Sequence, residues 1–119
     1  MHVSMAPDGH FWVQGEINGH SARFLIDSGA TITALSDATA RQAGLNVDTS
    51  GPGVIMHTAN GTIQAQRSSI ATLSVGPIRA SDIGIVVSPA FGDTNVLGMN
   101  FLSRLKSWRV ARDEMVLEQ

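Results

Sequence analysis

Apolar and polar residues alternate along most of the chain in short runs, and turn residues separate these runs about every 8 to 12 positions. Asn18-Gly19 lies between two such runs and is a strong signal for a two-residue hairpin. Short alternating segments at this spacing are typical of an all-β domain that is closed or sandwiched. The pattern predicts strands at residues 11–16, 21–26, 32–35, 54–57, 62–67, 69–75, 78–87, 108–110 and 115–117.

Two short helical segments are expected between these strands. Ser36 is suited to cap a helix over residues 37–43, and Gly44 is suited to end it. A second helical piece is predicted at residues 101–106, with loops at 49–53 and 89–94. A chain of 119 residues suits a single hydrophobic core, so we expect an N-terminal tail at residues 1–10 and one domain at residues 11–119.

The composition argues against several classes of function. A net charge of -2 gives no basic footprint for nucleic acid, and the absence of cysteine excludes a thiol nucleophile and disulfides. The 4 histidines lack the spacing of metal ligands, so we expect no metal and no cofactor. No apolar run reaches the roughly 18 to 20 residues that span a bilayer, and the start lacks a signal-peptide pattern. We therefore expect no membrane contact by this segment itself.

Residues 24–33 carry the strongest chemical signal, because an apolar strand runs directly into Asp27-Ser28-Gly29-Ala30. A carboxylate at the end of a buried strand needs hydrogen-bond donors, since an unsatisfied buried charge is costly. Ser28 offers a hydroxyl, and Gly29 lets the backbone turn so that amides point back at the carboxylate. The alternative interpretation is a polar turn without chemistry, because Asp, Ser and Gly are ordinary turn residues.

Three segments together resemble the retropepsin-like aspartic proteases, especially the bacterial single-domain members. Residues 24–33 are similar to the active-site loop of that family, and residues 95–102 look like its apolar-apolar-Gly segment and short helix. Residues 57–63 lie between them and carry a hairpin signal where such enzymes have their flap. The resemblance implies a closed retropepsin-like β-barrel and an aspartic endopeptidase that acts on extended peptides or proteins.

The resemblance also implies roles for individual residues. Asp27 is the expected catalytic carboxylate, and its loop is supported by Ser28, Gly29, Ala30 and Thr31. The flap, which would pair with the backbone of a bound peptide, is expected to contain Thr58, Ala59, Asn60 and Gly61. The candidate substrate-binding residues, which are of types found more often in a plain core, are Leu25, Met56, Thr94 and Val96.

A single chain holds only one Asp-Ser-Gly motif, whereas this chemistry needs two carboxyl groups. One activates water and the other protonates the departing group, and two carboxyls about 3 Å apart separate each other's pKa values. Asp93-Thr94-Asn95 lacks the required Gly, so we interpret Asp93 as a solvated loop residue. The dyad therefore requires a homodimer with Asp27 at the two-fold axis.

The dimer is expected to be weak. Retroviral members of the family usually carry Asp directly after the Ala and Arg directly after the second Gly, and these two residues form an ion pair that stabilises the dimer. Here the two positions are Thr31 and Met99, so both partners are missing at once and no charge is left unpaired.

Two alternatives to a protease remain open: a catalytically silent domain of the same fold that binds peptides or mediates assembly, and a structural β-domain. The intact Asp27-Ser28-Gly29, together with residues 96–98, favours the protease, because a silent domain has no physical need for the Asp. Bacterial relatives often carry an N-terminal anchor, so the resemblance suggests a soluble domain of a membrane-anchored or periplasmic protein.

Overall fold

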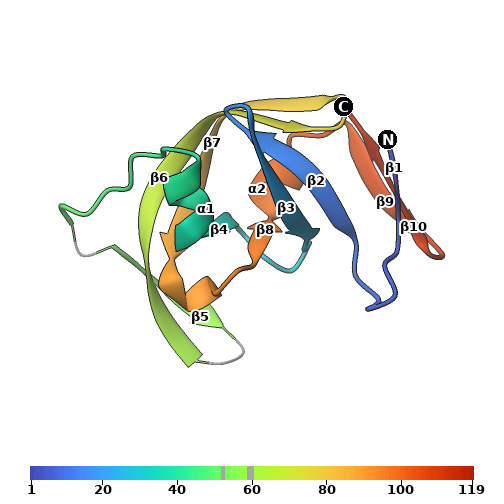
Figure 1. Ribbon diagram of the computed structural model, residues 1–119. Coiled ribbons are helices and arrows are strands. Elements are labelled where there is room, and N and C mark those ends of the chain that lie inside the picture. Colours follow the sequence, from blue (N-terminus) through green and yellow to red (C-terminus); the bar gives the residue numbers. More distant parts are fainter. Residues whose placement is uncertain (52, 59–60) are drawn as a thin grey trace.

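The computed structural model describes residues 1–51, 53–58 and 61–119, and most of them lie in β-strands (Figure 1). In chain order the elements are β1 (His2–Ser4), β2 (Trp12–Ile17), β3 (His20–Ile26), β4 (Thr33–Ser36), α1 (Asp37–Gln42), β5 (Val54–Thr58), β6 (Gly61–Val75), β7 (Ile78–Ser88), η1 (Pro89–Phe91), β8 (Asn95–Leu97), α2 (Met99–Leu102), β9 (Ser107–Ala111) and β10 (Glu114–Glu118).

Six strands close into a barrel. Their order is β2-β3-β8-β4-β7-β6, and the pairing of β6 with β2 joins the two ends. β5 lies outside the barrel as an antiparallel partner of β6. Within the barrel, β3 pairs with β8 and β4 with β7 in parallel, which brings distant parts of the chain side by side. The predicted all-β closed barrel with two short helices is confirmed.

The alternation in the sequence produces the barrel core. β3 buries Ala22, Phe24 and Ile26 while the residues between them are exposed or half-buried, as expected for side chains that alternate across a strand. The predicted hairpin between β2 and β3 is confirmed, because Asn18 and Gly19 both have positive φ, at 49° and 89°. The core residues with the largest fully buried side chains include Phe24, Phe101, Ile17, Leu35, Ile70, Leu73, Ile83 and Leu97.

The predictions for the longest strand, for the second helix and for one loop need correction. The separate strands predicted at 62–67 and 69–75 form one strand, β6, because Ser68 pairs with Ile85 without a break in register. The second helix begins at Met99 and ends at Leu102, earlier than predicted, because Gly98 acts as its N-cap. The loop predicted at 89–94 contains the 3-10 turn η1, whose first amides are capped by the Ser88 hydroxyl.

The first helix follows its prediction closely. Ser36 is the N-cap of α1, and its hydroxyl accepts a hydrogen bond from the Thr39 amide. Gly44 follows the helix with φ of 69°, the left-handed conformation that glycine adopts without steric cost. Across the described ranges, no helix has both the length and the apolar character needed to cross a membrane.

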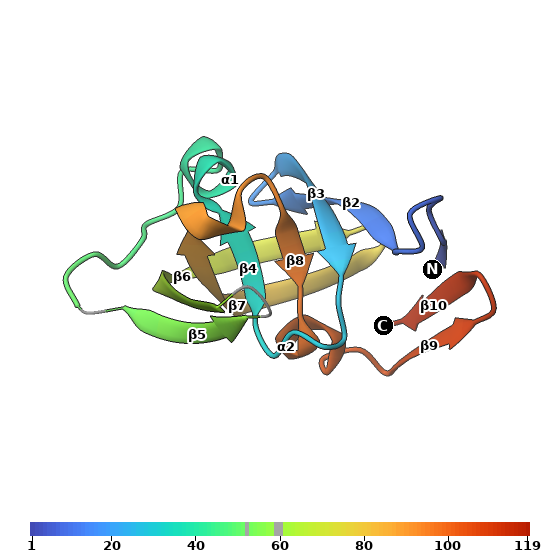
Figure 2. The same ribbon diagram turned by 90° about the horizontal axis from the view of Figure 1, so that it is seen from below.

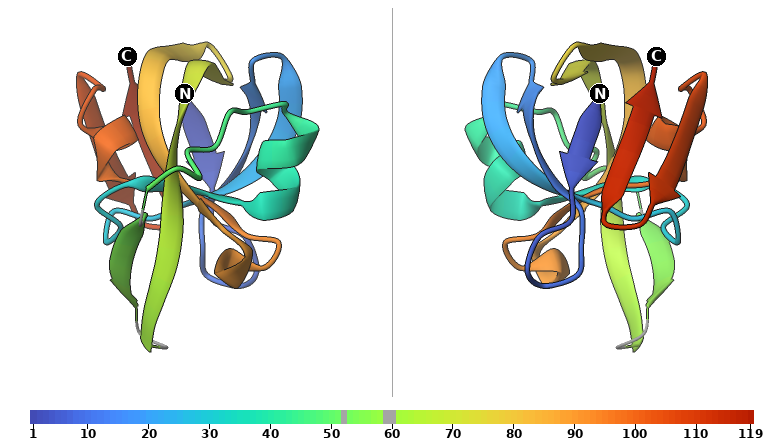
Figure 3. Two further views of the ribbon diagram at one scale, coloured as in Figure 1. Left: turned by 90° about the vertical axis from the view of Figure 1, so that its left-hand side faces the viewer. Right: turned by 90° about the vertical axis from the view of Figure 1, so that its right-hand side faces the viewer.

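A second sheet joins the two ends of the chain (Figure 3). Its strand order is β1-β10-β9, and β1 pairs antiparallel with β10. Residues 1–10, which we expected to be a tail, thus contribute a paired strand. The reason is that Val3 is buried against the core and the backbone of Met1 exchanges hydrogen bonds of 2.8 Å with that of Leu117.

Candidate active site

Asp27 lies where the parallel strands β3 and β8 end together. Ile26 is in register with Leu97, and the Asp27 amide donates a hydrogen bond to the Leu97 carbonyl at 3.0 Å. Asp27 and Gly98, which are far apart in the sequence, are therefore each the first residue beyond neighbouring strands. In Figure 2 the segment from β3 to β4 passes close to α2 at this end of the two strands.

The loop after Asp27 turns back on the carboxylate. The Gly29 amide donates to Asp27 Oδ1 at 2.8 Å, and the Ala30 amide donates to the Asp27 carbonyl at 3.2 Å. A Cβ on residue 29 would lie 3.1 Å from Oδ1, a tight contact, so glycine suits this position. Asp27 is half-buried, whereas Ser28, Gly29 and Thr31 are exposed.

Gly98 allows the loop to pack directly on the start of α2. The Met99 amide donates to the Ala30 carbonyl at 2.7 Å, and the Asn100 amide donates to the Thr31 carbonyl at 3.2 Å. A Cβ on residue 98 would lie 2.7 Å from the carbonyl carbon and oxygen of Ile32, which are backbone atoms with little room to move. The contact between the two segments therefore requires glycine here.

Thr33 and Asn100 form a hydrogen-bond network beneath this contact. The fully buried Thr33 hydroxyl accepts from the Gly98 amide at 3.2 Å and donates to Asn100 Oδ1 at 2.8 Å. The same Oδ1 accepts from the Thr33 amide, and Asn100 Nδ2 donates to the Gly84 carbonyl at 2.7 Å. These two side chains hold the Asp27 loop, α2 and β7 together.

Sequence reasoning missed this network. Both polar residues lie in apolar segments, Thr33 in a strand and Asn100 in a short helix, and a polar side chain in such a segment usually has a buried partner. That signal indicates some hydrogen bond, but it does not identify the two as partners, because they are 67 positions apart.

A cleft of about 740 Å³ opens beside Asp27. Of the candidate substrate-binding residues, Met56 and Val96 line it, whereas Leu25 and Thr94 are not among its lining residues. Ser28 also lies outside the lining, while the other residues of the loop contribute to it. The residues that line the cleft are Asp27, Gly29, Ala30, Thr31, Ile32, Ala34, Met56, His57, Phe91 and Val96.

Four of the lining residues were not predicted, namely Ile32, Ala34, His57 and Phe91. Ile32 directly precedes β4 and Ala34 lies two positions later within it, so period-two alternation could have placed them on one face. Phe91 comes from the segment that was predicted as a loop, and only the three-dimensional arrangement brings it to the cleft.

The predicted flap is described in part. Thr58 ends β5 and is paired in register with Gly61 at the start of β6. Ala59 and Asn60 lie outside the described residues, so their place at the tip stays a prediction. Met56 and His57 bring β5 to the edge of the cleft.

Asp27 is the one carboxylate among the residues that line the described cleft. Asp93 is exposed and lies outside this lining. The described part of the chain contains no group of three or more His, Asp or Glu side chains that could hold a metal ion. One carboxylate cannot act as base and acid in the same step.

Comparisons with known proteins agree with this geometry. Residues 13–104 match the model of a family described as gag-polyprotein putative aspartyl protease. The chain is 36% identical over 112 residues to an uncharacterized protein in the cobV 5' region of Sinorhizobium sp., and 27% identical over 115 residues to an uncharacterized protein of Rickettsia prowazekii.

These matches cover 92% and 97% of this chain but 48% and 49% of the relatives, so the chain spans about half the length of the two proteins. The fold also matches the crystal structure of a retropepsin-like aspartic protease from Rickettsia conorii, with a TM-score of 0.86 and 26% identity. That match covers 98% of this chain and 88% of the solved chain.

Proposed function

Because this chain belongs to the family of retropepsin-like aspartic proteases, we propose that it is an endopeptidase that cleaves extended polypeptides as a homodimer. The observation that carries the proposal is the position of Asp27. Its carboxylate is held by the Gly29 amide at the edge of an open cleft, where it is the one described acidic group. A β-barrel used only as a structural module has no need for a half-buried carboxylate at that place.

Two copies of Asp27 complete the chemistry. The ionised one accepts a proton from a water molecule, whose oxygen then bonds to the carbon of the scissile carbonyl. The protonated one gives its proton to the carbonyl oxygen, which yields a tetrahedral diol. The carboxyl that took the water proton then gives it to the amide nitrogen, while the other, now ionised, takes a proton from a hydroxyl of the diol. The C–N bond breaks and a carboxylic acid and an amine are released. No covalent bond between substrate and enzyme forms in these steps.

The surroundings of Asp27 support such a reaction. Reacting groups have to be held to within a fraction of an ångström, and a misplacement of about 1 Å can cost 10²-fold in rate. The network of Thr33, Gly98 and Asn100 holds the loop from below through backbone and buried side-chain hydrogen bonds. The exposed upper surface of the loop, at Ser28, Gly29 and Thr31, is then free to meet a second copy.

The proposed dimer is weak. Thr31 and Met99 cannot form the ion pair that is usual in retroviral members of the family. In addition, β1 is already paired with β10 of its own chain, so the terminal strands form a complete three-stranded sheet without exchange between copies. The contact between subunits is therefore expected to rest largely on the Asp27 loops.

An extended peptide fits the shape and chemistry of the cleft. Met56, Phe91, Val96 and Ala34 supply an apolar surface for side chains, and such surfaces with a few polar groups are typical of ligand sites. β5 is an edge strand of the sheet, so its free edge can pair with a peptide backbone in the strand-addition mode.

The test is cleavage of a library of unstructured peptides by the purified protein and by Asp27→Asn, with Asp93→Asn as a matched control. We expect Asp27→Asn to lose at least 10³-fold in activity while its circular dichroism and melting temperature stay unchanged, because Asn can neither accept nor share the proton. Asp93→Asn is expected to retain full activity. Substantial turnover by folded Asp27→Asn would refute the mechanism, and no cleavage by the unmodified dimer would favour the silent peptide-binding alternative.

A further inference from the structure

A single arginine lies on the apolar face that continues from the cleft. This face is built on a small cluster of buried side chains, Ala34, Ala65 and Val86, which is separate from the barrel core. Arg67 in β6 is in register with Val86 in β7, and Val86 is in register with Ala34 in β4. Residues directly opposite each other on neighbouring strands point to the same face of a sheet, so Arg67 shares the face of the cluster.

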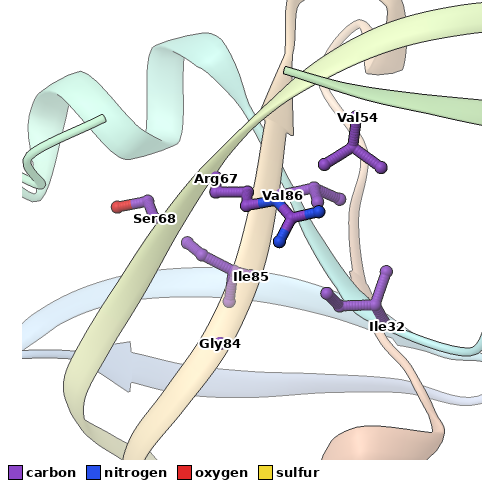
Figure 4. Close-up of a pocket in the computed structure, with 7 residues that line it drawn as sticks. All are labelled: Ile32, Val54, Arg67, Ser68, Gly84, Ile85 and Val86. Atoms are coloured by element: carbon purple, nitrogen blue, oxygen red, sulfur yellow. The ribbon is translucent and has the colours of Figure 1, made fainter. Parts of the chain in front are cut away.

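The side chain of Arg67 points along this face toward the cleft. Figure 4 shows its guanidinium group reaching across Val86 into the space between Val54 and Ile32. A pocket of about 260 Å³ lies here, and Ile32 lines both this pocket and the cleft beside Asp27. The guanidinium therefore lies beside a pocket that adjoins the proposed active site.

Arg67 forms no ion pair in the described part of the chain, where the two ion pairs join His2 to Glu114 and Arg41 to Asp37. Asp48 is a carboxylate near Arg67 in the chain's fold, and its amide donates to the Arg67 carbonyl at 2.9 Å. Oδ1 of its carboxylate accepts hydrogen bonds from the hydroxyl and the amide of Ser50 instead. These two bonds are the main cause of the lowered pKa of Asp48, and the charge of Arg67 lowers it further by a smaller amount.

We propose that Arg67 determines substrate specificity by binding the carboxylate of a Glu or Asp side chain in the peptide. This inference rests on the proposed function. The five planar donors of a guanidinium match a carboxylate in a bidentate geometry, and Arg67 is exposed, so a peptide side chain can reach it. The apolar surface also accommodates the methylene groups of the acidic side chain.

The sheet spacing indicates which peptide position reaches Arg67. β6 lies three strands from β8, which is roughly 14 Å at about 4.8 Å per strand. The guanidinium extends over Val86 in β7, the strand next to β6, and it shares a pocket with Ile32. An extended peptide rises about 3.3 Å per residue, so an acidic residue up to about four positions from the scissile bond covers this separation.

A symmetric dimer carries one Arg67 on each side of the dyad. The same preference is therefore expected on both sides of the scissile bond. A peptide with acidic residues on both sides would bind one Arg67 of each subunit.

The experiment compares matched peptides that carry Glu or Gln two, three or four positions from the cleaved bond and no other charge. Cleavage by the unmodified dimer is measured as kcat/KM, alongside Arg67→Gln, Arg67→Glu and the control Arg79→Gln. Arg79 is an exposed arginine at the other end of β7, away from the cleft. Binding of the same peptides to Asp27→Asn protein, with and without Arg67→Gln, provides a readout that does not need catalysis.

We expect the Glu peptide to be preferred about tenfold over the Gln peptide, with the preference falling as salt is raised. Arg67→Gln is expected to abolish the preference, so that the Glu and Gln peptides are cleaved with the same kcat/KM, and Arg67→Glu is expected to shift the preference toward a peptide with Lys at that position. Arg79→Gln is expected to change nothing.

Equal cleavage of both peptides by the unmodified dimer, or a preference that survives in Arg67→Gln, would overturn the inference. If no peptide is cleaved, the proposed function fails. The binding measurements alone then decide whether Arg67 binds an acidic side chain. Glu-selective binding that is lost in Arg67→Gln would still support the role of Arg67, whereas unselective or absent binding would overturn it.

Discussion

Gly98→Ala is the most direct test of how the active-site loop is held. The added methyl group would meet the carbonyl carbon and oxygen of Ile32 at 2.7 Å and the carbonyl oxygen of Ala30 at 2.9 Å. All three are backbone atoms of the loop that carries Asp27, so relief requires the loop and α2 to move apart. Gly98 has φ of -97°, a conformation that alanine adopts freely, so the effect isolates the contact from backbone strain.

The magnitude follows from two contributions. Overpacking of a tight site costs about 1–3 kcal/mol. Separation of the segments also weakens the hydrogen bonds from the Gly98 amide to Thr33 and from the Met99 amide to Ala30, each with a net contribution of about 0.5–1.5 kcal/mol. We expect a loss of about 3 kcal/mol. With an unfolding entropy of about 2.1 cal/mol/K per residue, this lowers the melting temperature of a chain of this size by roughly 12 °C.

The assay is urea and thermal unfolding at one fixed protein concentration, because dimerisation also shifts the apparent stability. Trp12 and Trp108 supply the fluorescence signal. Gly84→Ala is the matched control, since a Cβ on that exposed strand residue meets nothing within 4 Å. It is expected to stay within about 1 kcal/mol of the unmodified protein. A loss below about 1 kcal/mol for Gly98→Ala would show that the two segments do not need their close contact.

Further predictions concern the network, the acid limb of stability, the pH range of activity and the dimer. Asn100→Ala leaves the buried amide and hydroxyl of Thr33 without their acceptor and is expected to cost about 2–4 kcal/mol, while Asn100→Asp, which keeps that acceptor, costs less in the same unfolding assay. The pKa of Asp8 is lowered, chiefly by the His10 amide and then by Trp12, so its contribution to stability is present above about pH 4 and is lost as the pH falls through the lowered value. Asp8→Asn is therefore expected to make the free energy of unfolding depend less on pH on the acid side. Peptide cleavage is expected to follow a bell-shaped pH profile on the acid side, because one carboxyl must be ionised and the other protonated; a plateau through alkaline pH would contradict the dyad. Specific activity is expected to rise with protein concentration from nanomolar to high micromolar, and a constant value with a dimer throughout in sedimentation would refute a weak dimer.

Much of this protein is determined locally and is readable from the sequence. The hairpin at Asn18-Gly19 and the cap of α1 by Ser36 follow from the conformations that these residues prefer within a few positions of the chain. The period-two alternation likewise predicts which side chains enter the core, because side-chain direction alternates along a strand. The motif at Asp27 identifies the candidate carboxylate, since its residue types carry the signal.

Other features depend on which distant segments meet, and no local preference decides that. β1 became a strand because β10 offers a partner across nearly the whole chain, and the break predicted within β6 disappeared because β7 pairs with it throughout. The partnership of Thr33 with Asn100, the placement of Phe91 at the cleft beside Asp27 and that of Arg67 at the adjoining pocket arise only when the barrel closes. The residue types that perform the chemistry are therefore determined by the sequence itself. Their distances and shared faces are decided by the tertiary structure, because contacts between distant segments depend on the register of the whole sheet.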